Sequence, residues 1–363
     1  MRVDRSSVRA VLAAATALIA SSAVTAQQPK VATENLPAHA SAPAPRVVGE
    51  DFQTRCAKPG VIKCVGFDDP ADFDTGSGGS AGAYGLNSGI FPPSRTTDYT
   101  RAVRDTRVKA SGSSSLRFTI PSNSPSDPAG SYFTNFSKDL SLQFGENSEF
   151  FIQWRQRFSP ELVNTRFAGG GGWKQIIVGT GDQPPRNLSA SCTALEVVVQ
   201  NTYQRGFPQL YNSCTGSSSH GPFQPFEEPI AGSDFKLENG RPAPGCLYSQ
   251  GRTSFFPPVG NCFAYVANEW LTFQIRIRTG PRVADEFVDS HVTLWAAREG
   301  KPSELLIDWG PYKLTAGSAA QNQKFGKVWL LPYHTGKDAS ESHPTAYTWY
   351  DELVISRNRI ADP

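Results

Sequence analysis

Short stretches with the composition of β-strands recur along this chain between clusters of Gly, Pro, Ser and Asp, and no long amphipathic helical stretch competes with them. The 363 residues include 32 Gly, 28 Pro, 22 Phe and one Met, which is too much Gly and Pro for a helical bundle. Strands are predicted at ten places: 61–67, 115–120, 150–158, 174–179, 194–202, 270–279, 291–297, 305–309, 327–333 and 345–356. We therefore expect an all-β chain that folds as one two-sheet antiparallel β-sandwich.

The N-terminus has the features of a secretory signal. Three arginines precede an apolar stretch at 10–20, and small residues at 24–26 form a cleavage site. Because the apolar stretch is too short for a stable membrane anchor, we expect residues 1–26 to be removed and the protein to be secreted or periplasmic, without membrane attachment. Residues 27–50 are rich in Ala and Pro and are expected to form a disordered linker, which leaves 51–363 as a single domain.

The charge balance of the chain excludes one class of partner. Without the predicted signal, the chain contains 32 basic and 32 acidic residues. A neutral chain has no overall field that attracts nucleic acid, so we expect no nucleic-acid partner. Binding of a polyanion would have to come from a local patch.

All six cysteines follow the predicted signal, and an even number of cysteines in an exported chain predicts disulfides. Pairing of sequence neighbours gives three bridges: Cys56–Cys64, Cys192–Cys214 and Cys246–Cys262. Other connectivities stay possible, whereas a zinc site is disfavoured because no CxxC or HxxxH spacing occurs. Residues 203–262 contain three of these cysteines and many Gly, Pro and Ser, and we expect a long disulfide-stapled loop that could wall a groove.

Alternation shows which side chains of the predicted strands share a face. At 270–279, Phe and Ile alternate with polar residues, as in a half-buried strand. At 150–158, the side opposite the apolar one carries Gln153, Arg155 and Arg157. Guanidinium and amide groups suit the recognition of carboxylates and hydroxyls, so this side is a candidate binding surface. The alternative is an ordinary solvated face.

Three segments together resemble the concanavalin A-like jelly-roll superfamily of lectins, glucanases and polysaccharide lyases. GSSSLRF at 112–118 is similar to an early strand of that fold. EWLTFQIRI at 269–277 is similar to a strand that is entered through Trp, and TWYDELVIS at 348–356 is similar to the closing strand. Hydrolases of this superfamily carry Glu-x-Asp-x-x-Glu on one strand, which places two acids on one face. Here Asp351 and Glu352 are adjacent and are expected to face opposite ways, which argues against a glucanase.

The lyase branch of the superfamily is more similar. Jelly-roll alginate lyases have an Arg-rich strand, a Gln-Ile-His strand and a late strand that ends in a catalytic Tyr. This chain has, in the same order, IQWRQRF at 152–158, WKQIIVG at 173–179 and KVWLLPYHTGK at 327–337. An Ile replaces the His of the second strand, and His334 follows Tyr333, so the resemblance implies a relative near the glucuronan or heparin-lyase-like families rather than an alginate lyase itself.

β-Elimination on a uronate needs a neutralised carboxylate, a base for the C5 proton and an acid for the leaving O4. We expect Arg155 and Gln175 to bind the carboxylate. Tyr333 is the expected proton-transfer residue, and His334 is the alternative base; these four are the predicted catalytic residues. Substrate binding is predicted for six more: Gln153, Arg157, Trp173, Lys174, Lys337 and His343. Strand parity predicts one concave groove for Gln153, Arg155, Gln175 and Tyr333, with His334 and Lys337 at its rim.

Other interpretations stay open, because a Tyr at a sandwich edge and a lone His are often structural. The protein could be a non-catalytic, lectin-like carbohydrate-binding protein, or a glycoside hydrolase with an atypical acid pair. Four acids, Asp68, Asp69, Asp72 and Asp74, could bind a structural calcium ion, although a solvated turn is preferred. We expect a monomer without a cofactor, whose partner is a uronate-containing polysaccharide.

Overall fold

The fold is seen in a computed structural model. It describes residues 49–73, 81–84, 102–126, 130–165, 167, 173–181, 195–201, 208–213, 216, 246–247, 259–260, 262–317, 319–334 and 337–363. All of these belong to one compact unit, 46–363. The predicted signal, linker residues 27–48, Cys192, Cys214 and Asp74 lie outside the described residues. Within the described part of the chain, no helix is long and apolar enough to cross a membrane.

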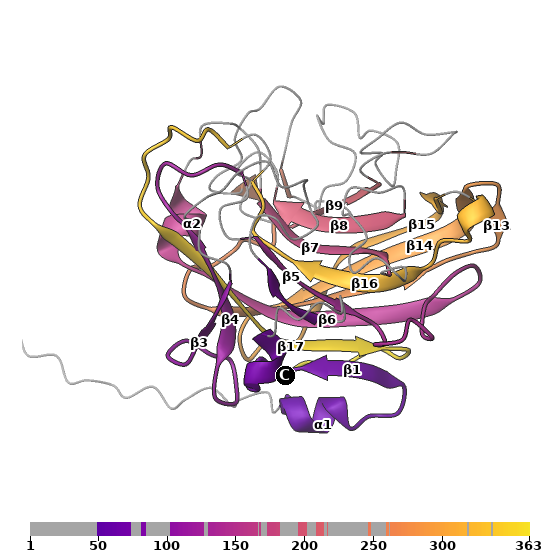
Figure 1. Cartoon of the computed structure of the whole chain (residues 1–363), viewed down its shortest axis with the longest axis horizontal. Helices are drawn as coiled ribbons and strands as arrows, with labels where there is room; N and C mark the ends of the chain where they lie inside the picture. The colour runs from indigo at the N-terminus through magenta and orange to yellow at the C-terminus, as the bar shows by residue number, and fades with distance from the viewer. Residues whose placement is uncertain are drawn as a thin grey trace, which may run out of the picture. The chain divides into compact units, whose positions relative to one another are not determined.

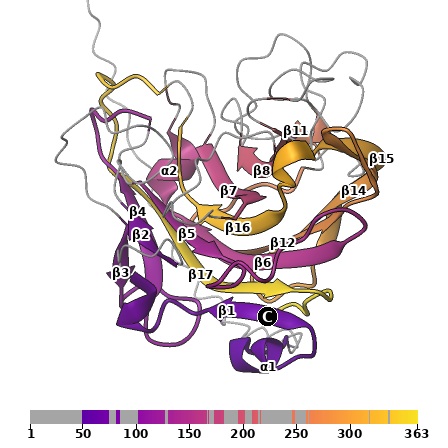
Figure 2. The same ribbon diagram turned by 45° about the vertical axis from the view of Figure 1, so that its right-hand side comes forward.

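Two antiparallel sheets form a β-sandwich, so the all-β prediction is confirmed (Figures 1 and 2). The nine-stranded sheet has the order β13-β14-β12-β6-β17-β4-β3, with β1 paired to β17 and β15 paired to β14. Its strands are β1 (Val61–Val65), β3 (Val103–Asp105), β4 (Ser115–Ile120), β6 (Glu149–Phe158), β12 (Trp270–Arg278), β13 (Arg282–Val283), β14 (Glu286–Ala297), β15 (Glu304–Thr315) and β17 (Ala346–Ser356).

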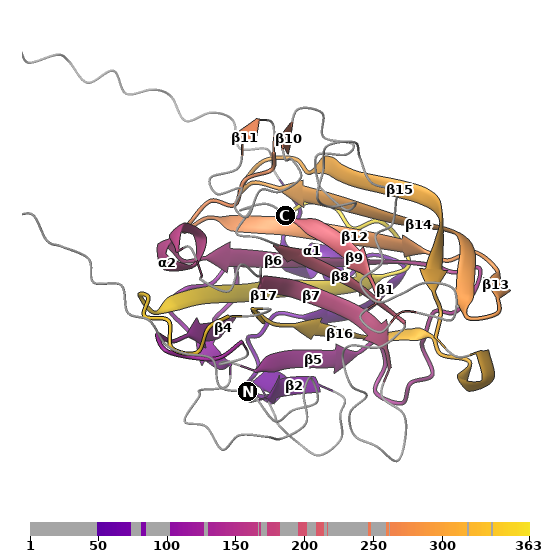
Figure 3. The same ribbon diagram turned by 90° about the horizontal axis from the view of Figure 1, so that it is seen from above.

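The second, six-stranded sheet lies against the first, and Figure 3 shows it in front when the fold is viewed from above. In spatial order its strands are β2 (Ala81–Tyr84), β5 (Ser131–Asn135), β16 (Phe325–Leu330), β7 (Trp173–Thr180), β8 (Glu196–Asn201) and β9 (Gln209–Asn212). The remaining elements are the strand pair β10 (Cys246–Leu247) and β11 (Val259–Gly260), helices α1 (Phe52–Cys56) and α2 (Pro160–Asn164), and 3-10 turns at Pro70–Phe73 and Ala319–Gln321. We call these two sheets the larger and the smaller sheet.

Each of the ten predicted strands is present, but several ends differ. The strand predicted at 327–333 ends at Leu330, two residues before Pro332, which has no N–H for a sheet ladder. The strand predicted at 305–309 continues to Thr315. Short strands such as β5 and β9 were not predicted, and β9 forms part of the segment 203–262 that was expected to be a loop.

The core lies between the sheets and follows the predicted alternation. On β6, the side chains of Ile152 and Trp154 are fully buried between the sheets, and on β12 those of Phe273 and Ile275 are buried with them. The rings of Trp154 and Phe273 stack at 5.4 Å. Complete burial of such a side chain contributes about 1.5–3 kcal/mol, so these alternating rows are a main source of stability.

Helix α1 packs on the outer face of the larger sheet, the face turned away from the smaller sheet (Figure 1). Asp51 caps it by accepting the backbone N–H of Thr54 at 2.9 Å. The predicted bridge Cys56–Cys64 is confirmed and joins the end of α1 to β1. Cys262 is also disulfide-bonded, and its partner lies among the cysteines whose side chains are outside the described set.

Candidate functional site

The outer face of the smaller sheet gathers charged and aromatic side chains. The strand register sets Glu196 opposite Gly179 and Gly179 opposite Lys327. A Cβ built on Gly179 would lie 3.1 Å from the Trp329 ring, which shows that Gly179 and Trp329 face the same way. Side chains of β16, β7 and β8 therefore lie side by side on this face. The described polar and aromatic side chains on this face are Phe133, Asn135, Lys174, Glu196, Gln209, Tyr211, Lys327, Trp329 and Tyr333, with the apolar Ile177 and Val198 among them. Within this set, Lys174 and Tyr333 are half-buried and the others are buried, so access is greatest at this pair.

Lys174 and Tyr333 contact each other through both backbone and side chain. The backbone N–H of Lys174 donates to the carbonyl of Tyr333 at 2.8 Å. The Lys174 amine lies 4.8 Å from the centre of the Tyr333 ring and 5.5 Å from that of Tyr211. A cation is stabilised over an aromatic ring at such distances, so the two rings hold the amine in place.

Burial makes the Lys174 amine easier to deprotonate, although the protonated form still predominates at pH 7. Loss of solvent lowers the pKa of Lys174 to about 8, although the carboxylate of Glu196 opposes this shift. Burial raises the pKa of the Tyr211 hydroxyl well above 10, and Glu196 and Tyr333 add to that shift. Near neutral pH, a useful fraction of the Lys174 amine is therefore free to accept a proton.

The outward direction of Lys174 depends on a β-bulge in β7. Lys174 is opposite Gln200 of β8, whereas Ile176 is opposite Val199, so Gln175 is an extra residue. Gln175 points into the sandwich, where its amide donates to Gln156 at 3.0 Å. The prediction that Gln175 lines the groove is therefore wrong. Parity correctly paired it with Trp173, but the face they share is the inner one.

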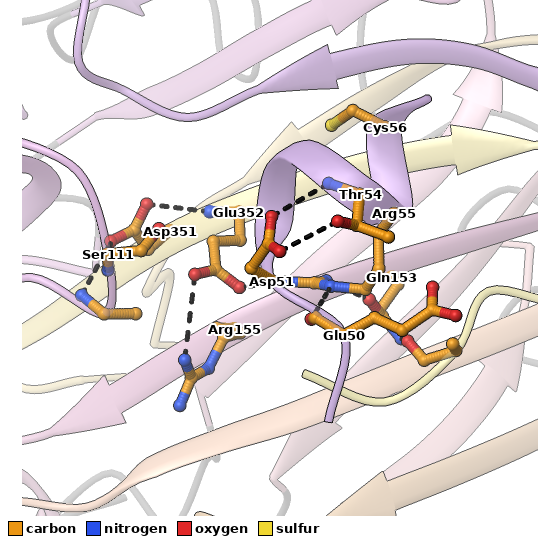
Figure 4. A network of polar contacts seen from close by, with 12 residues as sticks. Glu50, Asp51, Thr54, Arg55, Cys56, Ser111, Gln153, Arg155, Asp351 and Glu352 are labelled. Carbon is orange, nitrogen blue, oxygen red and sulfur yellow. Dashed lines mark hydrogen bonds and ion pairs between the residues drawn. The ribbon is translucent and has the colours of Figure 1, made fainter. Parts of the chain in front are cut away.

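The predicted arginine face lies on the other side of the molecule. Gln153 and Arg155 belong to β6 of the larger sheet and point outward, beneath α1 (Figure 4). Gln153 accepts a hydrogen bond from Arg55 and donates to the Ala361 carbonyl at 3.0 Å. The guanidinium of Arg155 is 3.7 Å from the carboxylate of Glu352.

The proposed groove that combines these residues with Tyr333 is therefore wrong, because the whole sandwich separates Arg155 from Tyr333. Arg157 shares the outward face of Arg155 and donates to Asn268 at 3.3 Å. The error has a physical cause. Alternation shows that Gln153, Arg155 and Arg157 share a face, but it does not show which sheet the strand joins.

The adjacent acids of β17 are engaged with other parts of the chain. Asp351 is opposite Arg155 and accepts the backbone N–H of Ala110 at 2.7 Å, and burial raises its pKa to about 8. Glu352 forms a buried ion pair with Arg55 (Figure 4). Because Glu352 adopts a positive φ of 49° in a bulge, both acids face outward, which corrects the expectation of opposite faces.

Trp173 and His334 form a buried cluster at the end of the sandwich rather than a groove rim. Trp173 is 6.0 Å from the Tyr265 ring and 5.7 Å from the imidazole of His334. His334 is 1% exposed and lies 4.4 Å from Phe167. Burial lowers the pKa of His334 to about 3, with a further contribution from Lys337, so the ring is neutral. These positions contradict a substrate-binding Trp173 and a base at His334.

Lys337 and His343 hold loops at this same end. The Lys337 amine donates to the carbonyl of Ser124 at 2.5 Å. The His343 ring contacts the carbonyl of Pro344 at 2.7 Å, and its backbone N–H donates to Ser122. Both side chains are buried, which contradicts their predicted exposure to substrate at a rim.

The calcium alternative can be compared with the contacts of Asp68. Its carboxylate accepts the backbone N–H groups of Ser113 and Ser114, the latter at 3.0 Å. Among the described residues, no three His, Cys, Asp or Glu side chains gather as a metal site. The described part of this segment thus uses Asp68 to hold a neighbouring loop.

Of the described residues on this face, only Lys174 and Tyr333 were predicted as site residues from the sequence; Glu196 and Tyr211, which lie beside the Lys174 amine, were missed. Glu196 lies on a predicted strand, but three valines follow it and Val198 shares its face, so no alternation marked it as outward. Tyr211 lies on β9, inside the segment expected to be a loop, and no sequence signal marked it.

No protein-family model matches the sequence, and no curated protein matches it. Solved structures with a similar fold include the PL-14 alginate lyase from Aplysia kurodai, with 12% identity, a TM-score of 0.47, and coverage of 81% of this chain and 98% of that one. A glucuronan lyase from Trichoderma reesei has 14% identity, a TM-score of 0.38, and coverage of 76% and 93%. An alginate lyase from a Chlorella virus has 10% identity, a TM-score of 0.39, and coverage of 82% and 100%. Each of these likenesses is one of fold alone.

Proposed function

We propose that this protein is an exported polysaccharide lyase that cleaves a uronate-containing glycan by β-elimination, with Lys174 and Tyr333 as its proton-transfer pair. One observation carries the proposal. The accessible point of a polar and aromatic sheet face holds an amine with a pKa lowered to about 8 directly against a tyrosine ring. A poised amine beside a phenol matches the base and the acid that elimination requires.

In the proposed reaction, the neutral amine of Lys174 removes the C5 proton of a uronate. The electron pair left at C5 forms the C4=C5 double bond as the C4–O4 bond breaks. The hydroxyl of Tyr333 gives its proton to O4 of the leaving chain. One product gains a new non-reducing unsaturated uronate, the other a hydroxyl, and proton exchange with water restores both residues.

The uronate carboxylate needs a partner that disperses the charge formed when C5 loses its proton. Gln209 is on the same outer face, opposite Gln200 of β8, which in turn is opposite Lys174. The Gln209 side chain is 1% exposed, so it does not reach a substrate carboxylate at the accessible Lys174–Tyr333 pair. Gln175 does not reach it either, because its amide is turned into the core, which leaves the Lys174 amine as the accessible cation of the described face.

A lectin-like protein is the second candidate, favoured by the half-buried ring of Tyr333, since sugar rings pack on aromatic side chains; Trp329, Phe133 and Tyr211 of the same face are buried. A glycoside hydrolase is less well supported because it needs two carboxylates. Among the described side chains of this face, Glu196 is the one carboxylate, and it is buried.

The test is to incubate the purified protein with a panel of uronate polymers and follow both near-ultraviolet absorbance and reducing ends. Elimination gives both signals, because only it forms the conjugated double bond. Reducing ends without new absorbance would indicate hydrolysis, and binding with neither signal would indicate a lectin. Lys174→Met should abolish turnover. The matched control is Lys313→Met, at an exposed lysine of β15 on the other sheet, which should leave turnover unchanged.

A further inference from the structure

A chain of buried polar side chains crosses the sandwich directly beneath Lys174. The Gln175 side chain accepts the Tyr265 hydroxyl at 2.5 Å and donates to Gln156 at 3.0 Å. Gln156 in turn donates to Thr348 of β17 at 3.0 Å. These four side chains are at most 5% exposed. Because burial of polar groups costs free energy unless their hydrogen bonds are made, such a complete network fixes geometry rather than adding hydrophobic stability.

The same network holds the backbone of the bulge. The hydroxyl of Tyr350, on β17 of the larger sheet, donates to the backbone carbonyl of Gln175 at 2.8 Å. The backbone N–H of Leu331 also donates to that carbonyl, over a long 3.5 Å, and Pro332 follows with no N–H. A side chain from the opposite sheet therefore provides the short hydrogen bond at this point.

The bulge decides where the Lys174 amine lies. Lys174 is opposite Gln200 and Ile177 is opposite Val198, so Lys174 and Ile177 share the outer face although they are three residues apart. A regular strand would put residues three apart on opposite faces. Bulges commonly redirect a side chain beside a functional site.

We propose that Tyr350, with Gln156 and Tyr265, is a positioning residue that holds the Gln175 bulge and so fixes the Lys174 amine against Tyr333. This inference rests on the proposed lyase function for its kinetic consequence, but not for its structural one. The charged and titratable groups that face the amine are Glu196, Tyr211 and Tyr333, on β8, β9 and the end of β16. A relaxed bulge would change the distance of the amine from all three.

The experiment compares Tyr350→Phe with Tyr347→Phe, which removes the same hydroxyl from the same strand. Tyr347 is on the opposite face of β17, where its ring contacts Arg117. In each variant, the Lys174 amine is titrated by NMR after isotopic methylation of lysines, with Lys174→Met used to assign the signal. We expect the titration midpoint to move measurably in Tyr350→Phe and to stay at the wild-type value in Tyr347→Phe. In kinetics, Tyr350→Phe should lower kcat about 10- to 100-fold with KM changed less than about twofold.

An unchanged Lys174 midpoint together with unchanged kcat in a folded Tyr350→Phe protein would overturn the proposal. If Tyr350→Phe does not fold, Tyr265→Phe removes the next hydroxyl of the network and must show the same shift. Failure of the proposed function is seen separately, as wild-type protein without turnover on any polymer. The NMR midpoint then still reports whether the network positions the amine.

Discussion

The backbone N–H of Lys174 donates to the carbonyl of Tyr333 at 2.8 Å, while the amine of the same lysine lies 4.8 Å from the ring of that tyrosine. Two segments far apart in sequence, the start of β7 and the residues just past β16, are thus joined by both a backbone and a side-chain contact. Lys174 belongs to β7, and the segment after β16 that contains Tyr333 is tied to β7 by this hydrogen bond and by the bridge between Trp173 and His334. Such support is what proton transfer between fixed groups requires.

Turnover should increase with pH around the pKa of Lys174. Because burial lowers that pKa from 10.5 to about 8, the amine becomes neutral as pH rises through about 8, and only the neutral form can take the C5 proton. We expect kcat to rise through that range and level off above it. The measurement is a kcat–pH profile. Lys174→Arg, which stays protonated, should be inactive at every pH, and residual activity with the same profile would contradict the assignment.

Tyr333→Phe should lower kcat about 10²- to 10⁴-fold, the usual contribution of a positioned acid or base, and leave oligosaccharide affinity almost unchanged. The ring that faces the Lys174 amine is kept in this variant, so only the hydroxyl is tested. Single-turnover kinetics and calorimetric binding measure the two quantities. If affinity and rate fall together, Tyr333 is a binding platform, and the lectin interpretation gains support.

The sheets of this fold were predictable because period-two alternation is a local signal. The inward rows of β6 and β12 are the apolar ones apart from Gln156, although both faces of these strands are largely buried. The candidate site was predictable only in part, since Lys174 and Tyr333 were named but their neighbours Glu196 and Tyr211 were not. Long-range pairing decides which sheet a strand joins. That pairing puts Arg155 on the outer face of the larger sheet, on the other side of the core from Tyr333.

Two further features explain the remaining errors. The bulge at Gln175 changes the parity of β7, and it depends on hydrogen bonds from Tyr265 and Tyr350, which are distant in sequence. The face of Gln153 is covered by α1, a five-residue helix too short to give a periodic signal. Local patterns therefore found the strands but not the partners that bury their polar faces.

Folding stability should fall as the solution is acidified, in part because of His334. Its pKa is lowered from 6.5 to about 3 in the folded protein, so the unfolded chain binds a proton first as pH falls. The contribution of His334 to the free energy of unfolding is full above about pH 6.5 and is lost progressively as the pH falls toward 3. Chemical denaturation at a series of pH values should show a shallower acid decline in His334→Leu than in wild type. An identical slope would show that His334 is protonated in the fold.

Titration of the denatured, unreduced protein should find no free thiol. Cys56 and Cys64 are bonded to each other, Cys262 is bonded, and six cysteines allow complete pairing. Mass mapping of peptides should show whether Cys262 joins Cys246, as its position in sequence predicts. Two or more free thiols would contradict three disulfides and weaken the proposal that the protein is exported.

Breaking the Arg55–Glu352 pair should destabilise the protein without affecting catalysis. Arg55 is fully buried, and its guanidinium bonds Glu352 and Gln153 (Figure 4). Arg55→Met leaves the Glu352 carboxylate buried with only the more distant Arg155, and loss of one partner of such a pair costs about 3–5 kcal/mol.

Denaturant unfolding measures this change, and kcat and KM should stay at wild-type values because the pair lies on the sheet face remote from Lys174. The control is Lys58→Met, which removes an exposed pair with Glu50 and should cost less than about 1 kcal/mol. The double variant Arg55→Met, Glu352→Leu should recover part of the lost stability, since no charge then stays buried without its partner. If Arg55→Met instead lowers kcat at full stability, the outer face of the larger sheet takes part in the reaction, and the placement of the site on the smaller sheet is wrong.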